Sequence, residues 1–78
     1  MDDIEHAVAA NVRAELARRR TRHSDVAAAL GITAGTLSRK LTGKVGISLT
    51  DLYVIANHLG AKPSEFLPSD VPTLSRAA

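Results

Sequence analysis

Apolar residues recur at helical intervals along most of this chain. The first run predicts a helix over about residues 5–20, with an apolar side chain every four positions and arginines at its end. The apolar positions are Ile4, Val8, Val12 and Leu16. Arginines suit the end of a helix because the helix dipole is negative there. We therefore expect an amphipathic first helix with one buried face.

Two shorter apolar stripes follow within residues 23–44, and each predicts a short helix. Their spacings, i, i+1, i+4 and then i, i+4, put the apolar side chains on one face of each helix. The stripes consist of Val26, Ala27 and Leu30, and of Leu37 and Leu41. Each helix thus has one face to bury against its neighbours.

A tight turn is predicted between these two helices. Gly31 follows the last apolar position of the first helix, where a left-handed backbone costs a glycine little. Ile32 can turn inward, and the Thr33 hydroxyl can cap the next helix by accepting a hydrogen bond from its backbone. The pattern predicts a helix-turn-helix, although a hairpin in any small helical bundle would share much of it.

A fourth helix is predicted between Ser48 and Gly60. Ser48 and Asp51 form a Ser-x-x-Asp start signal, and Gly60 provides a stop. The apolar positions between them are Leu49, Leu52, Ile55, Ala56 and Leu59. This segment completes the apolar surface that the first three helices need.

A short fifth helix is expected after Gly60. Pro63 suits its first position, and Phe66 and Leu67 are expected to fold back onto the core before Pro68 ends it. The chain is therefore predicted to be all-α, with five helices.

Composition supports one domain. With 78 residues and 45% hydrophobic content, the chain can bury a single core without a disulfide or metal. We place a helix-turn-helix domain over residues 1–68 and a C-terminal arm or flexible tail over residues 69–78. The absence of cysteine excludes a disulfide framework and a cysteine nucleophile, and it is consistent with a reducing cytosol.

The sequence does not favour a membrane-spanning or a secreted protein. No apolar run approaches the roughly 18 residues that would span a bilayer. The first residues are acidic where a secretory signal would be basic, so we expect a cytoplasmic protein.

The net charge of +2 conceals a strong excess of positive charge in the middle of the chain. Residues 18–44 carry seven arginines and lysines against Asp25 alone, a net +6, whereas residues 1–17 and 45–78 carry −3 and −1. The basic segment coincides with the predicted helix-turn-helix. A regularly charged polyanion is the natural partner for such a segment, and counterion release would make binding salt-dependent.

Four motifs together resemble one known family. They are Val26-Ala27…Leu30-Gly31-Ile32, the Thr-Leu-Ser-Arg run over 36–39, Gly43-Lys44, and the Leu-x-x-Ile-Ala-x-x-Leu-Gly pattern over 52–60. They resemble the lambda-type phage repressor and Cro proteins and their bacterial relatives, the XRE-type helix-turn-helix regulators, over about residues 8–67. The resemblance implies a compact five-helix, lambda-repressor-like fold. Its third helix would lie in the DNA major groove, usually in a dimer on a two-fold symmetric operator.

The chain departs from this family at several positions. His23 stands where relatives often have a DNA-contacting glutamine, with Arg22 just before it. Leu16 and Leu41 replace a buried ion pair that many members have, and an apolar pair should fold at least as well. The start of the third helix carries small residues where relatives often have longer base-reading side chains, which predicts modest specificity.

Helical geometry selects candidate DNA-contacting residues. With Leu37 facing inward, steps of about 100° per residue turn Gly35, Ser38, Arg39 and Thr42 away from the core. Arg39 alone could read a guanine bidentately. The base-reading candidates are Arg39, Thr36, Ala34, Gly35 and Ser38. The phosphate-contacting candidates are Arg22, His23, Thr33, Lys40, Thr42 and Lys44, which would fix register rather than sequence.

The sequence does not favour an enzyme. His6, His23 and His58 lie on different predicted helices without metal-ligand spacing, so neither a metal nor a cofactor is expected. Ser24 and Asp25 beside His23 point in different directions on a helix and cannot form a triad. No small-molecule ligand is expected.

Two functions of different classes stay open. One is a sequence-specific regulator that binds double-stranded operator DNA, potentially as a homodimer. The other is a protein-interaction module of the same fold, such as an antitoxin or an antirepressor. An exposed apolar stripe formed by Tyr53, Val54 and residues 71–74 would favour the second, although the same residues could make a dimer contact.

Overall fold

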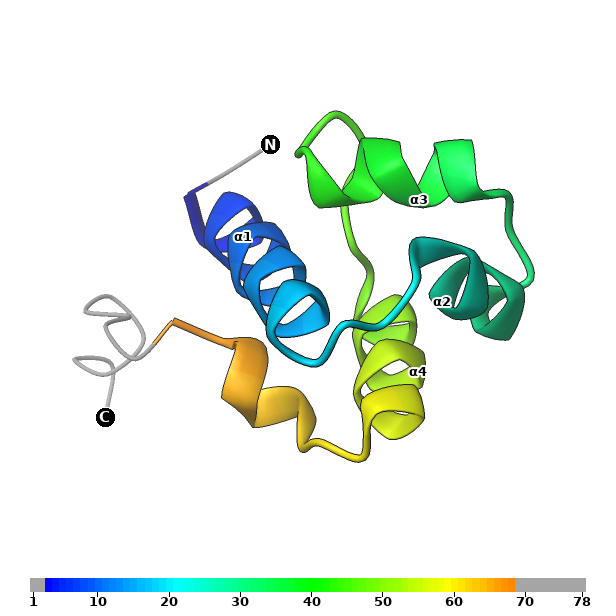
Figure 1. The fold of residues 1–78 in the computed structure, drawn as a ribbon. Coiled ribbons are helices and arrows are strands. Elements are labelled where there is room, and N and C mark those ends of the chain that lie inside the picture. Colours follow the sequence, from blue (N-terminus) through cyan, green and yellow to red (C-terminus); the bar gives the residue numbers. More distant parts are fainter. Residues whose placement is uncertain (1–2, 69–78) are drawn as a thin grey trace, which may run out of the picture.

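The structure, a computed structural model, describes residues 3–68 (Figure 1). Four α-helices are followed by one turn of 3-10 helix, and no strand occurs in this range. The elements are α1 (Asp3–Arg18), α2 (His23–Leu30), α3 (Ala34–Leu41), α4 (Leu49–Leu59) and η1 (Pro63–Phe66). The predicted arm over residues 69–78 lies outside the described residues.

The predicted start and stop signals form the expected local structures. Thr33 accepts a hydrogen bond from the backbone N–H of Thr36 at the start of α3. At the start of α4, Ser48 and Asp51 cap each other reciprocally. Gly31 and Gly60 end α2 and α4 in the left-handed conformation, with φ of 72° and 69°. Local sequence therefore determines where α3 and α4 begin and where α2 and α4 end.

The helices surround one apolar core. α2 packs against both α3 and α4, α1 packs against α3, and η1 joins α1 to α4. The core side chains are Val8, Val12, Leu16, Val26, Ala27, Leu37, Leu41, Leu52, Ile55, Ala56, Leu59 and Phe66. Leu16 and Leu41, which the resemblance predicted as an apolar pair, are both about 1% exposed and belong to this core. This core fixes α3 along one side of the molecule (Figure 1).

Two predicted features of the helices are wrong. α1 ends at Arg18 rather than near residue 20, and Arg20 adopts a left-handed backbone with φ of 54°. The predicted fifth helix is a four-residue 3-10 turn, because the chain returns to an extended conformation at Leu67. Phe66 is buried as expected, whereas Leu67 is 46% exposed and does not fold onto the core.

None of the helices in residues 3–68 has the length and apolar character needed to cross a bilayer.

Candidate nucleic-acid interface

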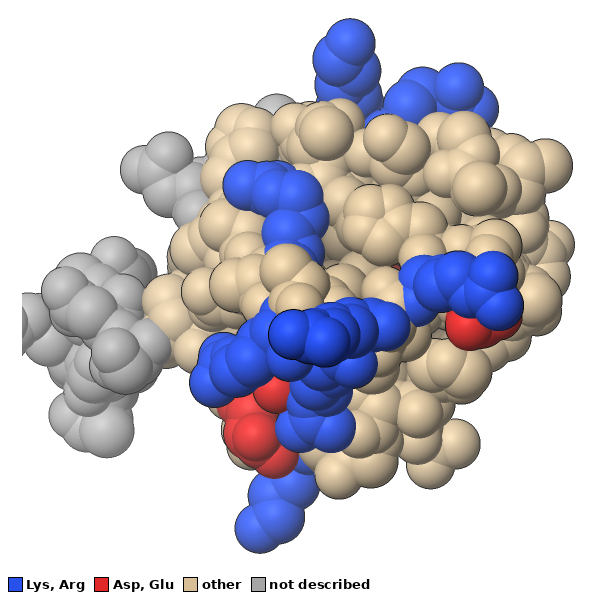
Figure 2. All heavy atoms as spheres, viewed as in Figure 1, with Lys and Arg blue, Asp and Glu red and all other residues tan. Residues whose placement is uncertain are grey.

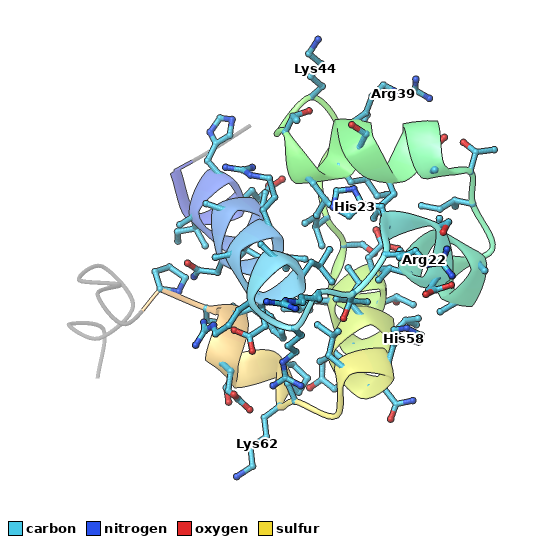
Figure 3. All side chains as sticks on the ribbon, viewed as in Figure 1. Arg22, His23, Arg39, Lys44, His58 and Lys62 are labelled. Carbon is cyan, nitrogen blue, oxygen red and sulfur yellow. The ribbon has the colours of Figure 1, made fainter. Side chains whose placement is uncertain are left out.

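The outer side of α3 is exposed and carries one long cationic side chain, that of Arg39. Leu37 and Leu41 are buried, which turns the opposite side of the helix to solvent. The exposed residues there are Ala34, Gly35, Ser38, Arg39 and the C-cap Thr42. Figure 3 shows Arg39 on this side, pointing away from the other helices. The helical-wheel prediction of which residues face outward is therefore confirmed, while their roles stay predictions.

Arg39 is held along α3 by a threonine. Its Nη2 donates to Oγ1 of Thr36, one turn earlier, at 3.2 Å. Oγ1 of Thr36 also lies 3.0 Å from Oγ1 of Thr33, the residue that caps the helix. Side chains on helices lean towards the N-terminus, and this bond keeps the guanidinium over the first turns of α3.

The loop after α3 is shaped by two contacts. The hydroxyl of Thr42 donates to the carbonyl of Ser38 at 2.9 Å and so closes the end of the helix. Gly43 follows with φ of 85°, and the ring of His6 on α1 lies where a Cβ atom of residue 43 would be. This packing places Lys44 at an exposed position beyond the end of α3, where Figure 3 shows it pointing outward.

The N-terminus of α2 has no side-chain cap. Arg22 occupies the N-cap position, and its side chain accepts no hydrogen bond from the helix. His23, the first helical residue, is exposed beside it. Arg22 lies 4.0 Å from Asp25 in a loose, exposed ion pair. A helix N-terminus without a side-chain cap and a nearby arginine are features that can bind phosphate oxygens.

Lys40 lies in a different environment from the other phosphate candidates. Its Nζ is 2.8 Å from Oδ2 of Asp51, and both side chains are largely buried, with 15% and 20% exposed. Nζ also donates to the carbonyl of Gly46 at 3.3 Å. Burial raises the pKa of Asp51, but hydrogen bonds from Lys40 and Ser48 and the charge of Lys40 outweigh it and lower that pKa. Lys40 therefore connects α3 to the start of α4.

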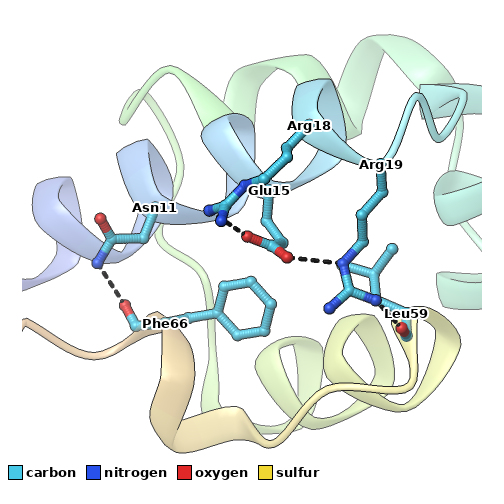
Figure 4. Close-up of polar contacts among 6 residues, drawn as sticks. All are labelled: Asn11, Glu15, Arg18, Arg19, Leu59 and Phe66. Atoms are coloured by element: carbon cyan, nitrogen blue, oxygen red, sulfur yellow. Dashed lines mark hydrogen bonds and ion pairs between the residues drawn. The ribbon is translucent and has the colours of Figure 1, made fainter.

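The arginines at the end of α1 are also engaged within the protein. Arg18 and Arg19 each lie 2.6 Å from a carboxylate oxygen of Glu15, and Arg19 donates to the carbonyl of Leu59 at the end of α4 (Figure 4). The hydrogen bond from Arg19, helped by the charge of Arg18, lowers the pKa of Glu15 although burial opposes it. Arg19 therefore links the end of α1 to the end of α4.

A further arginine, which the sequence analysis did not single out, positions α3. Arg13 on α1 donates to the carbonyl of Leu41, the last residue of α3. The positive charge also suits the negative end of the α3 dipole. Figure 2 shows the Lys and Arg side chains spread in separate groups over the face in view, some of them beside acidic side chains. The net +6 of residues 18–44 falls to +4 once Glu15 and Asp51 are included.

The fold and this surface define an all-α helix-turn-helix domain of the DNA-binding class. A family model described as the Cro/C1-type HTH DNA-binding domain matches residues 11–68, and the chain belongs to this family. The expected resemblance to Cro-like helix-turn-helix proteins is thereby confirmed. Neither a curated protein nor a solved structure matched the chain.

The family supports DNA as the partner and is not typically enzymatic. In residues 3–68, no three histidine, cysteine or acidic side chains come together so that they could hold a metal ion.

Proposed function

We propose that this protein is a sequence-specific, double-stranded DNA-binding transcription regulator, of the phage-repressor or Cro-like kind. It occupies an operator by placing α3 in the major groove. The observation that carries the proposal is the outer side of α3, where Arg39 is the only long side chain between small residues over positions 34–42. A helix with such a face can approach base edges closely.

The base-reading roles follow from side-chain size and chemistry. The guanidinium of Arg39 reads a guanine through two parallel hydrogen bonds. Ser38 and Thr36 offer hydroxyls to a base or a neighbouring phosphate. Ala34 contacts a thymine methyl, and Gly35 lets the backbone come close to the DNA.

Phosphate contacts come from both sides of α3. Arg22 and His23 present the uncapped N-terminus of α2 to one strand, and Lys44 reaches the backbone beyond the end of α3. The hydroxyls of Thr33 and Thr42 can add two neutral contacts. Lys40 is left out of the proposal, because its amine is engaged by Asp51 and the Gly46 carbonyl.

A homodimer fits the positions of the exposed apolar side chains. Ile4, Leu49 and Leu67 line a groove of about 460 Å³ between the start of α1, residues 46–49 and the end of η1. They are 41%, 72% and 46% exposed. Because the groove lies beyond the C-terminal end of α3, a two-fold axis there would put one α3 helix on each half-site. Half-sites should then lie about one helical turn apart.

The interface would be small. A groove with a few apolar side chains falls below the roughly 1,200 Å² typical of stable complexes. Two copies should therefore associate weakly in solution and assemble on the operator.

The test is binding to the DNA flanking the gene, compared with a scrambled duplex of equal length, across a salt series. A specific regulator should prefer one duplex by roughly a thousandfold or more. If both duplexes bind with equal affinity and binding is lost at physiological salt concentration, the proposed regulator function is wrong. Tyr53, which is 62% exposed, and the apolar groove would then direct the search to a protein partner, as expected of an antitoxin or antirepressor.

A further inference from the structure

Three hydrogen-bonding groups form a continuous chain along the first turns of α3. The backbone N–H of Thr36 donates to Oγ1 of Thr33 at 3.1 Å, and the Thr33 hydroxyl donates to Oγ1 of Thr36 at 3.0 Å. Nη2 of Arg39 then donates to the same Thr36 oxygen at 3.2 Å. Oγ1 of Thr36 thus accepts two hydrogen bonds and keeps its own hydrogen free. The helix cap and the guanidinium of Arg39 are connected through one hydroxyl.

This connection leaves the arginine able to bind DNA. A guanidinium has five N–H donors, and the bond to Thr36 uses one of them. A guanine needs two. In the described part of the chain no carboxylate pairs with Arg39, in contrast to Arg18 and Arg19. Thr36 therefore restricts the guanidinium without neutralising it.

The same bond holds the guanidinium near the N-terminus of α3, where the helix has no long side chain of its own. In a helix-turn-helix protein, the N-terminal residues of the recognition helix contact base edges. Here those positions hold Ala34 and Gly35, and Gly35 has no neighbouring atom closer than 3.9 Å to where a Cβ would be. The guanidinium, held back by Thr36, lies over this first turn and can supply the donor that the small residues lack.

The geometry points to Thr36 as a positioning residue, which sets the guanine selectivity of this protein by pre-ordering Arg39 before DNA binds. This inference rests on the proposed function. Ordering a long, flexible side chain on binding costs about 0.5–1.5 kcal/mol, which corresponds to about 2- to 13-fold in affinity. Removing the Thr36 hydroxyl should reduce the preference for guanine by this factor.

The main experiment compares Thr36→Val with Thr36→Ser. Valine keeps the branched shape and removes the hydroxyl, whereas serine keeps the hydroxyl. Each protein selects from a randomised double-stranded DNA pool, and its affinity is then measured for the selected duplex and for the same duplex with the guanine replaced. We expect Thr36→Val to lose about 2- to 13-fold in guanine preference and Thr36→Ser to keep it. Thr50→Val, an exposed threonine on α4, is the matched control and should change nothing.

A double-mutant cycle separates positioning from direct contact. If Thr36 acts through Arg39, Thr36→Val should reduce guanine preference less in an Arg39→Ala background than in the natural chain. An equal effect in both backgrounds would overturn the inference, because Thr36 would then act only through its own contact with DNA. Unchanged guanine preference in the single variant Thr36→Val would overturn it as well.

A measurement without DNA distinguishes failure of this inference from failure of the proposed function. Nuclear magnetic resonance of the free, full chain can follow the Nε–H group of Arg39. Its rotation should be restricted in the natural chain and in Thr36→Ser, and free in Thr36→Val. Equal mobility in all three refutes positioning. If the mobility differs as expected but no duplex is selected, the positioning is real and the regulator function is wrong.

Discussion

Two arginine-bearing regions of this protein, the junction of α1 and α4 and the outer side of α3, have opposite environments. At the junction of α1 and α4, Glu15 accepts from both Arg18 and Arg19, and Arg19 also holds the carbonyl of Leu59. On the outer side of α3, the guanidinium of Arg39 donates to the neutral hydroxyl of Thr36, its one hydrogen-bond partner within residues 3–68. The first region is a partly exposed ion-pair network, and the second holds a cation that pairs with no carboxylate of residues 3–68.

The arginines of the two regions carry the same charge and differ in their hydrogen-bond partners. A nearby carboxylate neutralises the charge of the guanidinium and accepts its hydrogen bonds within the protein. A neutral hydroxyl orders the guanidinium and leaves its charge for an anion. Exposed ion pairs contribute little to stability individually, so the bond from Arg19 to the α4 carbonyl is the important part of the first region.

The largest expected effect comes from Arg39→Ala. Loss of a bidentate arginine–guanine contact should reduce discrimination at one base position by about 5- to 160-fold, from the usual 1–3 kcal/mol. The measurement is affinity for the selected duplex and for its single-base variants. Arg18→Ala, which removes an arginine from the ion-pair network, is the control. An equal loss in Arg18→Ala would remove the distinction between the two regions.

Arg19→Ala should affect folding instead. The variant loses a charged hydrogen bond to the end of α4 and one partner of Glu15. Because the Arg19 side chain is 37% exposed, we expect a loss of about 1 kcal/mol, or about 4–8 °C in Tm. Thermal unfolding followed by circular dichroism measures it. Below the transition, DNA affinity should match that of the natural chain, and a selective loss of binding would contradict the assignment.

Sequence predicts the local features of this fold well. The caps at Thr33 and Ser48 and the glycine stops at Gly31 and Gly60 are encoded within three or four residues. Residues on the outer side of α3 follow from helical periodicity, because Leu37 and Leu41 fix the inward direction. The bond between Thr36 and Arg39 has i, i+3 spacing, so inspection of that spacing could have found it.

Contacts between distant segments could not be predicted in the same way. Lys40 pairs with Asp51, 11 positions away, and Arg19 reaches a carbonyl 40 positions away. The net charge of residues 18–44 counts both cations as available to bind an anion, because their partners lie outside this segment. The 3-10 form of η1 was equally hidden, because Pro63 and Pro68 predict where a short helix begins and ends but not its hydrogen-bond pattern.

Acid should weaken the link between α3 and α4. The pKa of Asp51 is below its ordinary value of 3.8 in the folded protein, so its ionised form adds stability above that pH. This stability is lost as the pH falls through the lower, folded pKa. Asp51→Asn should cost about 0.5–1 kcal/mol at neutral pH, and the difference from the natural chain should shrink as the pH falls through the lowered pKa of Asp51. Urea unfolding at several pH values measures it, and a constant difference across the range would refute the ion pair.

The smallest effect should come from Lys44→Ala, which tests the edge of the DNA-facing region. Lys44 is exposed beyond the end of α3, and a screened contact with one phosphate contributes about 0.5 kcal/mol, or about twofold in affinity. The loss should be the same for every duplex, because a phosphate carries no base identity. The slope of log affinity against log salt should fall by about one. Lys62→Ala is the control, since Figure 3 shows Lys62 at the end of the molecule opposite Lys44. If Lys62→Ala reduces the slope equally, the binding surface extends beyond α2 and α3, and the comparison between the two regions no longer separates binding from folding.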